Sequence, residues 1–290
     1  MAYQYLIPAI FFAFALAEIM RSRFFRMPHE KNGDKYVEII STVLLIGLVQ
    51  PLTLLLAGKS AAYLLPSAAN SLAETALVLQ VALLIVCDDM VQYWWHRASH
   101  TFPWLYGLHR AHHNADYMSI RIVYRNNLFY YALMPSLWLS GLLIYLGLGP
   151  VYVVYIVVKM AVIYGAHSNV RWDEKLYKIK ALSPIMWLLE HTISTPATHA
   201  AHHGKYKADP ATHYTGNFGN LFFFWDVLFG TAKITRGYPQ HIGVENLAPM
   251  SAGAQLLWPF IHDKTSPTEE ITEEMPEETG VIDGVTQSAE

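Results

Sequence analysis

The stretch PVYVVYIVVKMAVIYGAH, residues 150–167, contains one lysine and no acidic residue, and it ends on a histidine. A helix needs about 20 predominantly apolar residues to cross the roughly 30 Å hydrocarbon layer of a membrane. Comparable apolar runs occur earlier in the chain, at residues 3–20, 36–57, 72–93 and 128–148. Together these runs predict an all-α, multi-pass transmembrane protein with about five crossings.

The last two apolar runs also allow a second interpretation. They could form a hairpin turned at Gly147, Gly149 and Pro150, which would leave four crossings and a hairpin. Pro51 and Pro135 are expected to kink the second and fourth runs, because proline cannot donate the helical hydrogen bond. The overall composition, 53% hydrophobic and 15% charged, is more apolar than that of ordinary soluble proteins.

Charge is divided unevenly along the chain. Residues 263–290 hold nine acidic groups and one basic one, and this composition predicts a disordered acidic tail. The rest of the chain holds 19 Lys and Arg against 14 Asp and Glu, so the overall charge of −3 conceals a basic body. We expect no nucleic-acid partner, since the sequence indicates a membrane protein.

The distribution of Lys and Arg predicts how the chain is oriented, because these residues are retained in short cytoplasmic loops. The loop after the first apolar run is strongly basic, whereas the next loop holds only Lys59. The first loop is therefore expected on the cytoplasmic side. Counting crossings from there places the segments 94–127 and 168–262 on the same side, as a helical cap.

Eight histidines form three clusters, and all of them follow the third or fifth apolar run. Residues three or four apart share one face of a helix, so each cluster can aim its imidazoles at one point. Adjacent histidines diverge by about 100° around a helix axis, so each member of a pair can serve a different metal ion. The clusters are His96 and His100 in HRASH; His109, His112 and His113 in HRAHH; and His199, His202 and His203 in HAAHH.

This number of imidazoles predicts two metal ions at the cytoplasmic face. A catalytic zinc takes three protein ligands and a structural zinc four, so eight candidates are too many for one ion. Imidazole binds iron, zinc, copper and nickel alike, and the spacing leaves the metal open. The HExxH and Glu-x-x-His patterns are absent, and the single Cys87 excludes a thiolate cage.

The three clusters, with the flanks DDMVQYWWHR, TPATHAAHHG and NFGNLFFFWDVLFGT, resemble the fatty acid hydroxylase and sterol desaturase superfamily over residues 73–231. The third cluster and its flanks look most like the branch of alkylglycerol monooxygenases and bacterial sterol desaturase-like proteins. The resemblance implies a membrane-embedded enzyme with two non-haem iron ions, which uses O2 and two external electrons. It also implies a catalytic domain at residues 72–262, preceded by transmembrane helices and a cytoplasmic loop at 1–71.

The resemblance further implies nine metal ligands and several supporting residues. His167, in GAHSNV, matches the isolated histidine of the family and joins the eight clustered ones. Metal-bound imidazoles need a partner on the second ring nitrogen. Three residues that match family positions are expected to support the ligands, namely Asp89, Asn217 and Asp226, although Asp226 could instead cap a helix.

Three polar residues have open roles in the sequence. His191 lies eight residues before His199 and could touch the site. Lys159 lies inside an apolar run, where a charge is costly and faces protein or a wet cavity. It could meet a polar lipid group, or it could snorkel or pair with a buried polar residue. Asp88 could be no more than a solvated charge at the membrane edge.

The expected function is O2-dependent hydroxylation or desaturation of a C–H bond in a membrane lipid. No dinucleotide fingerprint, haem or iron–sulfur module is visible, so electrons are expected from a separate ferredoxin or cytochrome b5-like protein. The membrane would be a bacterial inner membrane or the endoplasmic reticulum. A zinc-dependent membrane lipid hydrolase is the alternative, and metal transport without catalysis ranks third because the histidines gather at one face.

Overall fold

The computed structural model describes residues 5–21 and 24–263. Within these ranges the chain is all helical and has no β-strand, only the isolated bridges Ile193–Phe222 and Gly204–Ile242. The prediction of an all-α protein is therefore confirmed. The predicted acidic tail, residues 263–290, lies outside the described residues except for Asp263.

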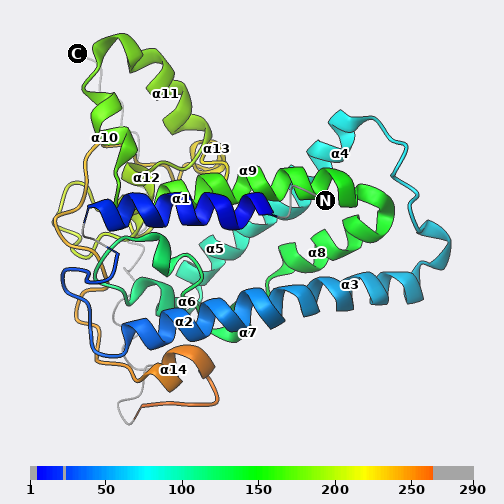
Figure 1. Cartoon of the computed structure of the whole chain (residues 1–290), viewed down its shortest axis with the longest axis horizontal. Coiled ribbons are helices and arrows are strands. Elements are labelled where there is room, and N and C mark those ends of the chain that lie inside the picture. Colours follow the sequence, from blue (N-terminus) through cyan, green and yellow to red (C-terminus); the bar gives the residue numbers. More distant parts are fainter. Residues whose placement is uncertain (1–4, 22–23, 264–290) are drawn as a thin grey trace, which may run out of the picture.

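Apolar helices form the elongated part of the molecule shown in Figure 1. They are α1 (Leu6–Met20), α2 (Asp34–Leu44), α3 (Gln50–Leu64), α4 (Leu77–Leu84), α5 (Val91–Thr101), α8 (Pro135–Leu143) and α9 (Gly149–His167). The turns of π-helix at Leu45–Val49 and Ile85–Met90 make α2 continuous with α3 and α4 continuous with α5. A third π segment, Ile144–Leu148, connects α8 to α9.

Three continuous helices are long and apolar enough to cross a membrane by length and composition, and these features indicate a membrane protein. They are Asp34–Leu64, Leu77–Thr101 and Pro135–His167, while α1 is shorter. The third contains a reversal, because Gly147 has a left-handed φ of 109° and Figure 1 shows α9 running in the opposite direction to α8. Five crossings and a cytoplasmic cap stay predictions.

Two of the expected helix boundaries were wrong. The run at 128–148 is interrupted, because α7 (Leu128–Ala132) ends before Pro135 begins α8. Proline fits the first turn of a helix, where its missing N–H has no intrahelical acceptor, so Pro135 starts a new helix instead of kinking one. The run at 72–93 begins later, at Leu77, and its helix continues to Thr101.

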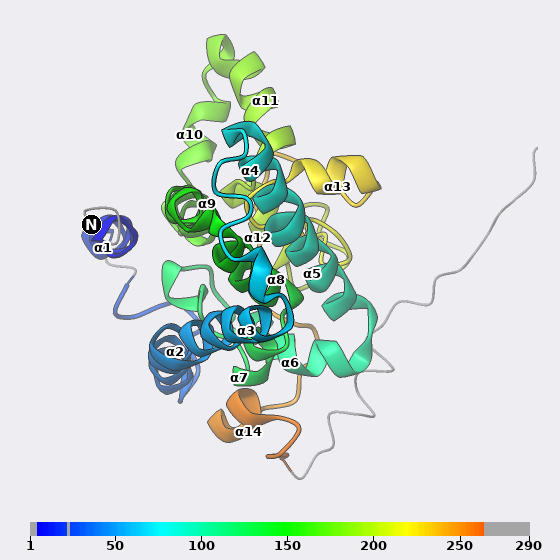
Figure 2. The same ribbon diagram turned by 90° about the vertical axis from the view of Figure 1, so that its right-hand side faces the viewer.

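The shorter helices gather at one end of the molecule, on the left in Figure 1, where the three histidine clusters lie. They are α6 (Pro103–His113), α7, α10 (Trp172–Tyr177), α11 (Ser183–Thr192), α12 (Pro196–His202), α13 (Phe224–Phe229) and α14 (Ala252–Leu257). The connection between α3 and α4 and the turn between α8 and α9 lie at the opposite end. The helices α3 and α8, α1 and α9, and α4 and α9 pack against one another, and Figure 2 shows this arrangement along the helix axes.

Buried ion pairs attach the start of α2 to the histidine-bearing end. The guanidinium of Arg125 is fully buried, and its Nη2 donates to Oδ1 of Asp34 at 2.8 Å. Its Nε donates to the carbonyl of Ala111 in α6 at 2.9 Å. The pair therefore holds α6, which carries three of the clustered histidines, in a fixed position relative to α2.

Candidate metal centre

Four helices supply the nine histidines. The first cluster lies on α5 and the second on α6. His199 and His202 lie on α12, His203 directly follows its last residue, and His167 is the last residue of α9. Pro103 begins α6, and a reciprocal pair of hydrogen bonds between Thr195 and Thr198 caps the start of α12. Because α5 packs on α6 and α12 packs on α9, segments distant in the sequence meet at one place.

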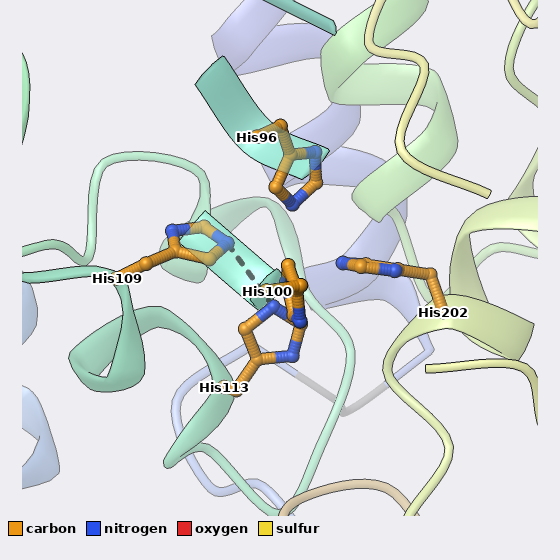
Figure 3. A group of neighbouring side chains, drawn as sticks. All are labelled: His96, His100, His109, His113 and His202. Atoms are coloured by element: carbon orange, nitrogen blue, oxygen red, sulfur yellow. Dashed lines mark hydrogen bonds between the residues drawn. The ribbon is translucent and has the colours of Figure 1, made fainter. Parts of the chain in front are cut away.

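The nine side chains form two groups, each with its ligand atoms within 4.8 Å of one another. Figure 3 shows the imidazoles of the first group directed toward a common point. We call the groups site A and site B. Site A consists of His96, His100, His109, His113 and His202, and site B of His112, His167, His199 and His203.

Each adjacent pair of histidines is divided between the two sites. His113 belongs to site A and His112 to site B, and in the third cluster His202 belongs to site A and His203 to site B. This is the division that the 100° helical step between neighbours predicts. The histidines at i and i+4 stay together: His199 of α12 and His203, the residue that caps the end of this helix, lie one turn apart.

Backbone carbonyls orient four of the imidazoles. Nδ1 of His96 donates to the carbonyl of Phe218 at 2.7 Å, and Nδ1 of His202 donates to that of Gly216 at 2.8 Å. In site B, His112 and His167 donate in the same way to Ile122 at 3.1 Å and Ile163 at 2.8 Å. A carbonyl only accepts, so each Nδ1 carries the proton and each Nε2 keeps a lone pair for a metal.

The remaining nitrogens fit a metal ion. Nε2 of His96, His100 and His202 is buried without a hydrogen-bond partner in the described residues. In site B, Nε2 of His199 lies 2.9 Å from Nε2 of His167. In each group the imidazole nitrogens lie within 4.8 Å of one another with no carboxylate among them, an arrangement that matches the imidazole-binding ions iron, zinc, copper and nickel.

Burial also keeps the histidines in the form that binds metal. Desolvation lowers the pKa of His113 and that of His203 well below 6.5, and the neighbouring imidazoles lower both further. A proton on Nε2 would block the lone pair, so a low pKa favours ligation near neutral pH.

The three residues expected to support the ligands form no hydrogen bond with a histidine in the described residues, and each of them bonds to backbone groups near the histidines. Asp89 accepts from the amides of Leu221 and Phe222 at 3.3 and 3.2 Å and from the indole of Trp225 at 2.9 Å. Asp226 accepts from the amides of Phe218 and Gly219 at 2.8 and 2.7 Å. Both carboxylates thus hold the loop whose Phe218 carbonyl orients His96.

Asp226 is buried, which explains its perturbed ionisation. Desolvation raises the pKa of the Asp226 carboxyl to about 6, while hydrogen bonds from Thr231 and the two loop amides act in the opposite direction. Its oxygens bond to loop amides seven and eight residues earlier in the chain, so the alternative interpretation as a helix cap is wrong.

Asn217 braces the same loop from the other side. Its amide donates to the carbonyl of Thr198 at 2.9 Å, next to His199, and its oxygen accepts from the amide of Lys233 at 2.7 Å. Its φ of 59° is left-handed, a conformation that asparagine adopts more readily than most residues. It therefore links the loop to α12.

The structure also places the residues whose roles the sequence left open. His191 belongs to neither site. Its ring stacks on that of Trp187 with 4.3 Å between the ring centroids, and its Nδ1 donates to the Trp187 carbonyl. Lys159 is buried and pairs with Asp88. Asp88 is also buried, so its interpretation as a solvated charge is wrong.

Sequence reasoning missed the residues that contact the imidazoles directly. Asn126 lies 3.2 Å from Nδ1 of His109 through its side-chain oxygen, and nothing in its local sequence indicates this. The carbonyls of Phe218, Gly216, Ile122 and Ile163 are backbone atoms, so residue type carries no signal for them.

A cavity of about 370 Å³ extends from the histidines into the helical part of the molecule. Four histidines from both sites line it, namely His96, His109, His112 and His167. Apolar side chains of α8 and α9 form much of the rest, among them Leu137, Ile156 and Met160. An apolar chain placed in this cavity would reach the metal centre.

The fold and this arrangement of histidines coincide with a known family. A family model described as fatty acid hydroxylase matches residues 81–231, which is more than half of the chain and includes all nine histidines. The chain belongs to the fatty acid hydroxylase family. The resemblance to the fatty acid hydroxylase and sterol desaturase superfamily is therefore confirmed.

Among characterised proteins, the chain is similar to an alkylglycerol monooxygenase from Danio rerio. The two are 27% identical over 146 residues, which is 49% of this chain and 28% of the relative. The match therefore spans less than a third of the relative's length. No solved structure shows significant similarity to the chain.

Proposed function

We propose that this protein is an O2-dependent, membrane-bound oxidoreductase that hydroxylates or desaturates a C–H bond in a lipid. The observation that carries the proposal is the pair of histidine sites at the end of an apolar cavity. Membership of the fatty acid hydroxylase family supports lipid oxidation, and so does the name of the monooxygenase relative.

The nine histidines of sites A and B are proposed to hold two iron ions, with residues 72–262 as the catalytic domain. When bound, the two ions would supply O2 activation and accept electrons, chemistry that protein side chains lack. The chain's own contribution is to fix the imidazoles through the Phe218, Gly216, Ile122 and Ile163 carbonyls. The apolar walls of the cavity bind the lipid chain and exclude water.

The metal centre is proposed to face the cytoplasm. The membrane would be the inner membrane of a bacterial cell or the endoplasmic reticulum of a eukaryotic cell. The basic segments of the sequence support this orientation, since Arg21, Lys31 and Lys35 follow α1 in the sequence and the Lys31 ammonium donates to the carbonyl of Asn114, the residue after His113. A separate ferredoxin or cytochrome b5-like protein would deliver the electrons. A basic surface attracts such acidic carriers at long range.

Lipid analysis of whole cells tests the activity directly. Cells that lack the gene would be complemented with the wild-type protein or with the His112→Ala variant, and their lipids compared by mass spectrometry. The proposal expects a lipid that gains one oxygen or loses two hydrogens only with the wild type. The same lipid profile in cells with the wild-type protein and in cells with His112→Ala would contradict the proposal.

Oxygen consumption separates oxidation from hydrolysis. The purified protein should consume O2 only when both lipid and reductant are present. Lipid turnover by a zinc-loaded protein in the absence of O2 would instead establish the hydrolase alternative.

A further inference from the structure

A buried polar network lies inside the helical part of the molecule, away from the histidines. Lys159 in α9 pairs with Asp88, and both residues are almost fully buried. The hydroxyl of Tyr155 donates to Oδ2 of Asp88 at 2.7 Å, and that of Ser140 donates to Oδ1 at 3.2 Å. The carboxylate is therefore well satisfied by donors, and the ion pair is neutral as a unit.

The network stands at a defined depth from the metal centre. Lys159 lies eight residues before His167 on α9, and Asp88 lies eight residues before His96 on α4–α5. Eight helical residues span about 12 Å along the axis. All four residues line the same cavity, so it has histidines at one level and an ion pair at another.

Donors that line the same cavity are available to a ligand. Ser136 of α8 lines the cavity and is 1% exposed, yet its hydroxyl has no hydrogen-bond partner in the described residues. The ammonium of Lys159 carries three donors, and Asp88 is the acceptor that pairs with it in the described part of the chain. A buried polar group without a partner costs about 1–3 kcal/mol, so an acceptor supplied by a ligand would be favoured there.

We propose that Lys159, Asp88 and Ser136 form a subsite that binds a neutral hydroxyl group of the lipid substrate. The inference rests on the proposed function and narrows its substrate class. The Lys159–Asp88 pair has no net charge, and the neighbouring buried carboxylate of Asp89 is held by the Leu221 and Phe222 amides and the Trp225 indole. A ligand carboxylate would therefore be buried beside acidic groups, and a ligand ammonium would be buried beside Lys159. A hydroxyl accepts from the free donors and adds no charge.

The subsite would determine which carbon is oxidised. A lipid held by its hydroxyl at the ion pair presents to the histidines the part of its chain that lies about 12 Å away along the helix axes. Lys159 and Ser136 act here as specificity-determining residues that touch the substrate at a distance from the reacting carbon.

Direct binding of matched probes tests the subsite without requiring turnover. The full-length, metal-loaded protein in detergent micelles would be titrated with hexadecan-1-ol, hexadecane, hexadecanoate and hexadecylamine, and bound ligand measured by native mass spectrometry. We expect the alcohol to bind about tenfold more tightly than the alkane, the ratio that one hydrogen bond to a charged group supplies.

Two serines on α8 provide matched variants. Ser136→Ala removes the unpartnered hydroxyl and should reduce the preference for alcohol about threefold to tenfold, with alkane binding unchanged. Ser140→Ala, one turn further along, removes a hydroxyl that is already bonded to Asp88 and is not part of the cavity wall. This control should keep the preference near the wild-type value.

Each other outcome would overturn the subsite. The subsite is contradicted if alcohol and alkane bind equally or if no probe binds. It is also contradicted if the carboxylate or the amine binds more tightly than the alcohol, or if Ser136→Ala leaves the preference for alcohol unchanged. The readout does not depend on O2, so an alcohol that binds as described but is never oxidised would overturn the proposed function and leave the subsite intact.

Discussion

Replacing Asp226 by asparagine tests whether the loop at 216–219 controls the metal centre. The Asp226 carboxylate accepts from the amides of Phe218 and Gly219 at 2.8 and 2.7 Å and from the Thr231 hydroxyl at 2.7 Å. In Asp226→Asn one oxygen becomes an NH2 group, which places a donor opposite a backbone N–H. His96 depends on this loop, because its Nδ1 donates to the Phe218 carbonyl.

The expected magnitude follows from these contacts. A buried donor that loses its acceptor costs about 1–3 kcal/mol. Residues that support a metal ligand indirectly change metal affinity about 10–100-fold when they are replaced. His96 belongs to site A alone, so we expect one of the two metals to dissociate more readily and the other to stay bound.

A chelator titration measures this effect. Metal per chain would be determined after equilibration of the purified protein with increasing chelator concentrations. The variant should lose about half of its metal at a chelator concentration about 10–100-fold lower than the wild type requires. Asp209→Asn is the matched control, because Asp209 also accepts from two backbone amides, those of Ala211 and Gln240, and bonds to no histidine of the centre.

The reasoning would be refuted if the Asp226→Asn titration coincided with that of the wild type. It would also be refuted if Asp209→Asn caused the same shift, since the effect would then follow from general destabilisation.

Three further predictions concern stability and pH. Thr195→Ala removes the side-chain acceptor for the amide of Thr198 at the start of α12 and should lower the free energy of unfolding by about 1 kcal/mol; chemical denaturation that gives no difference would contradict it. Gly107→Ala places a Cβ 2.7 Å from the Trp258 ring and should cost about 1–3 kcal/mol in the same assay, and an unchanged midpoint would count against this packing. Burial lowers the pKa of His213 from 6.5, so the unfolded chain takes up a proton at this residue before the folded one as the pH falls. His213→Gln should therefore lose less stability than the wild type below pH 6.5, and equal losses in thermal unfolding would disprove this.

The helical period made the two metal sites predictable. The HRAHH and HAAHH motifs place adjacent histidines about 100° apart on a helix, and the structure assigns His112 and His113 to different sites. Gly147 likewise predicted a possible turn, because glycine readily adopts left-handed backbone angles. The structure gives Gly147 a φ of 109°.

Other features depended on contacts that residue type does not encode. Lys159 pairs with Asp88, which lies 71 positions earlier in the chain. The sequence around either residue does not indicate which residue is its partner. Asp89 is expected to support the ligands, and the sequence does not show that it binds the backbone amides of a distant loop. Pro135 was expected to bend a helix, yet tertiary packing allowed the chain to end one helix and begin another there.

The proposed function depends most directly on the number and kind of metal ions that the nine histidines hold. Elemental analysis of the full-length protein, purified from its own membrane without added metal, measures both. We expect two iron ions per chain. One ion per chain, or a full complement of zinc, would contradict the proposed function.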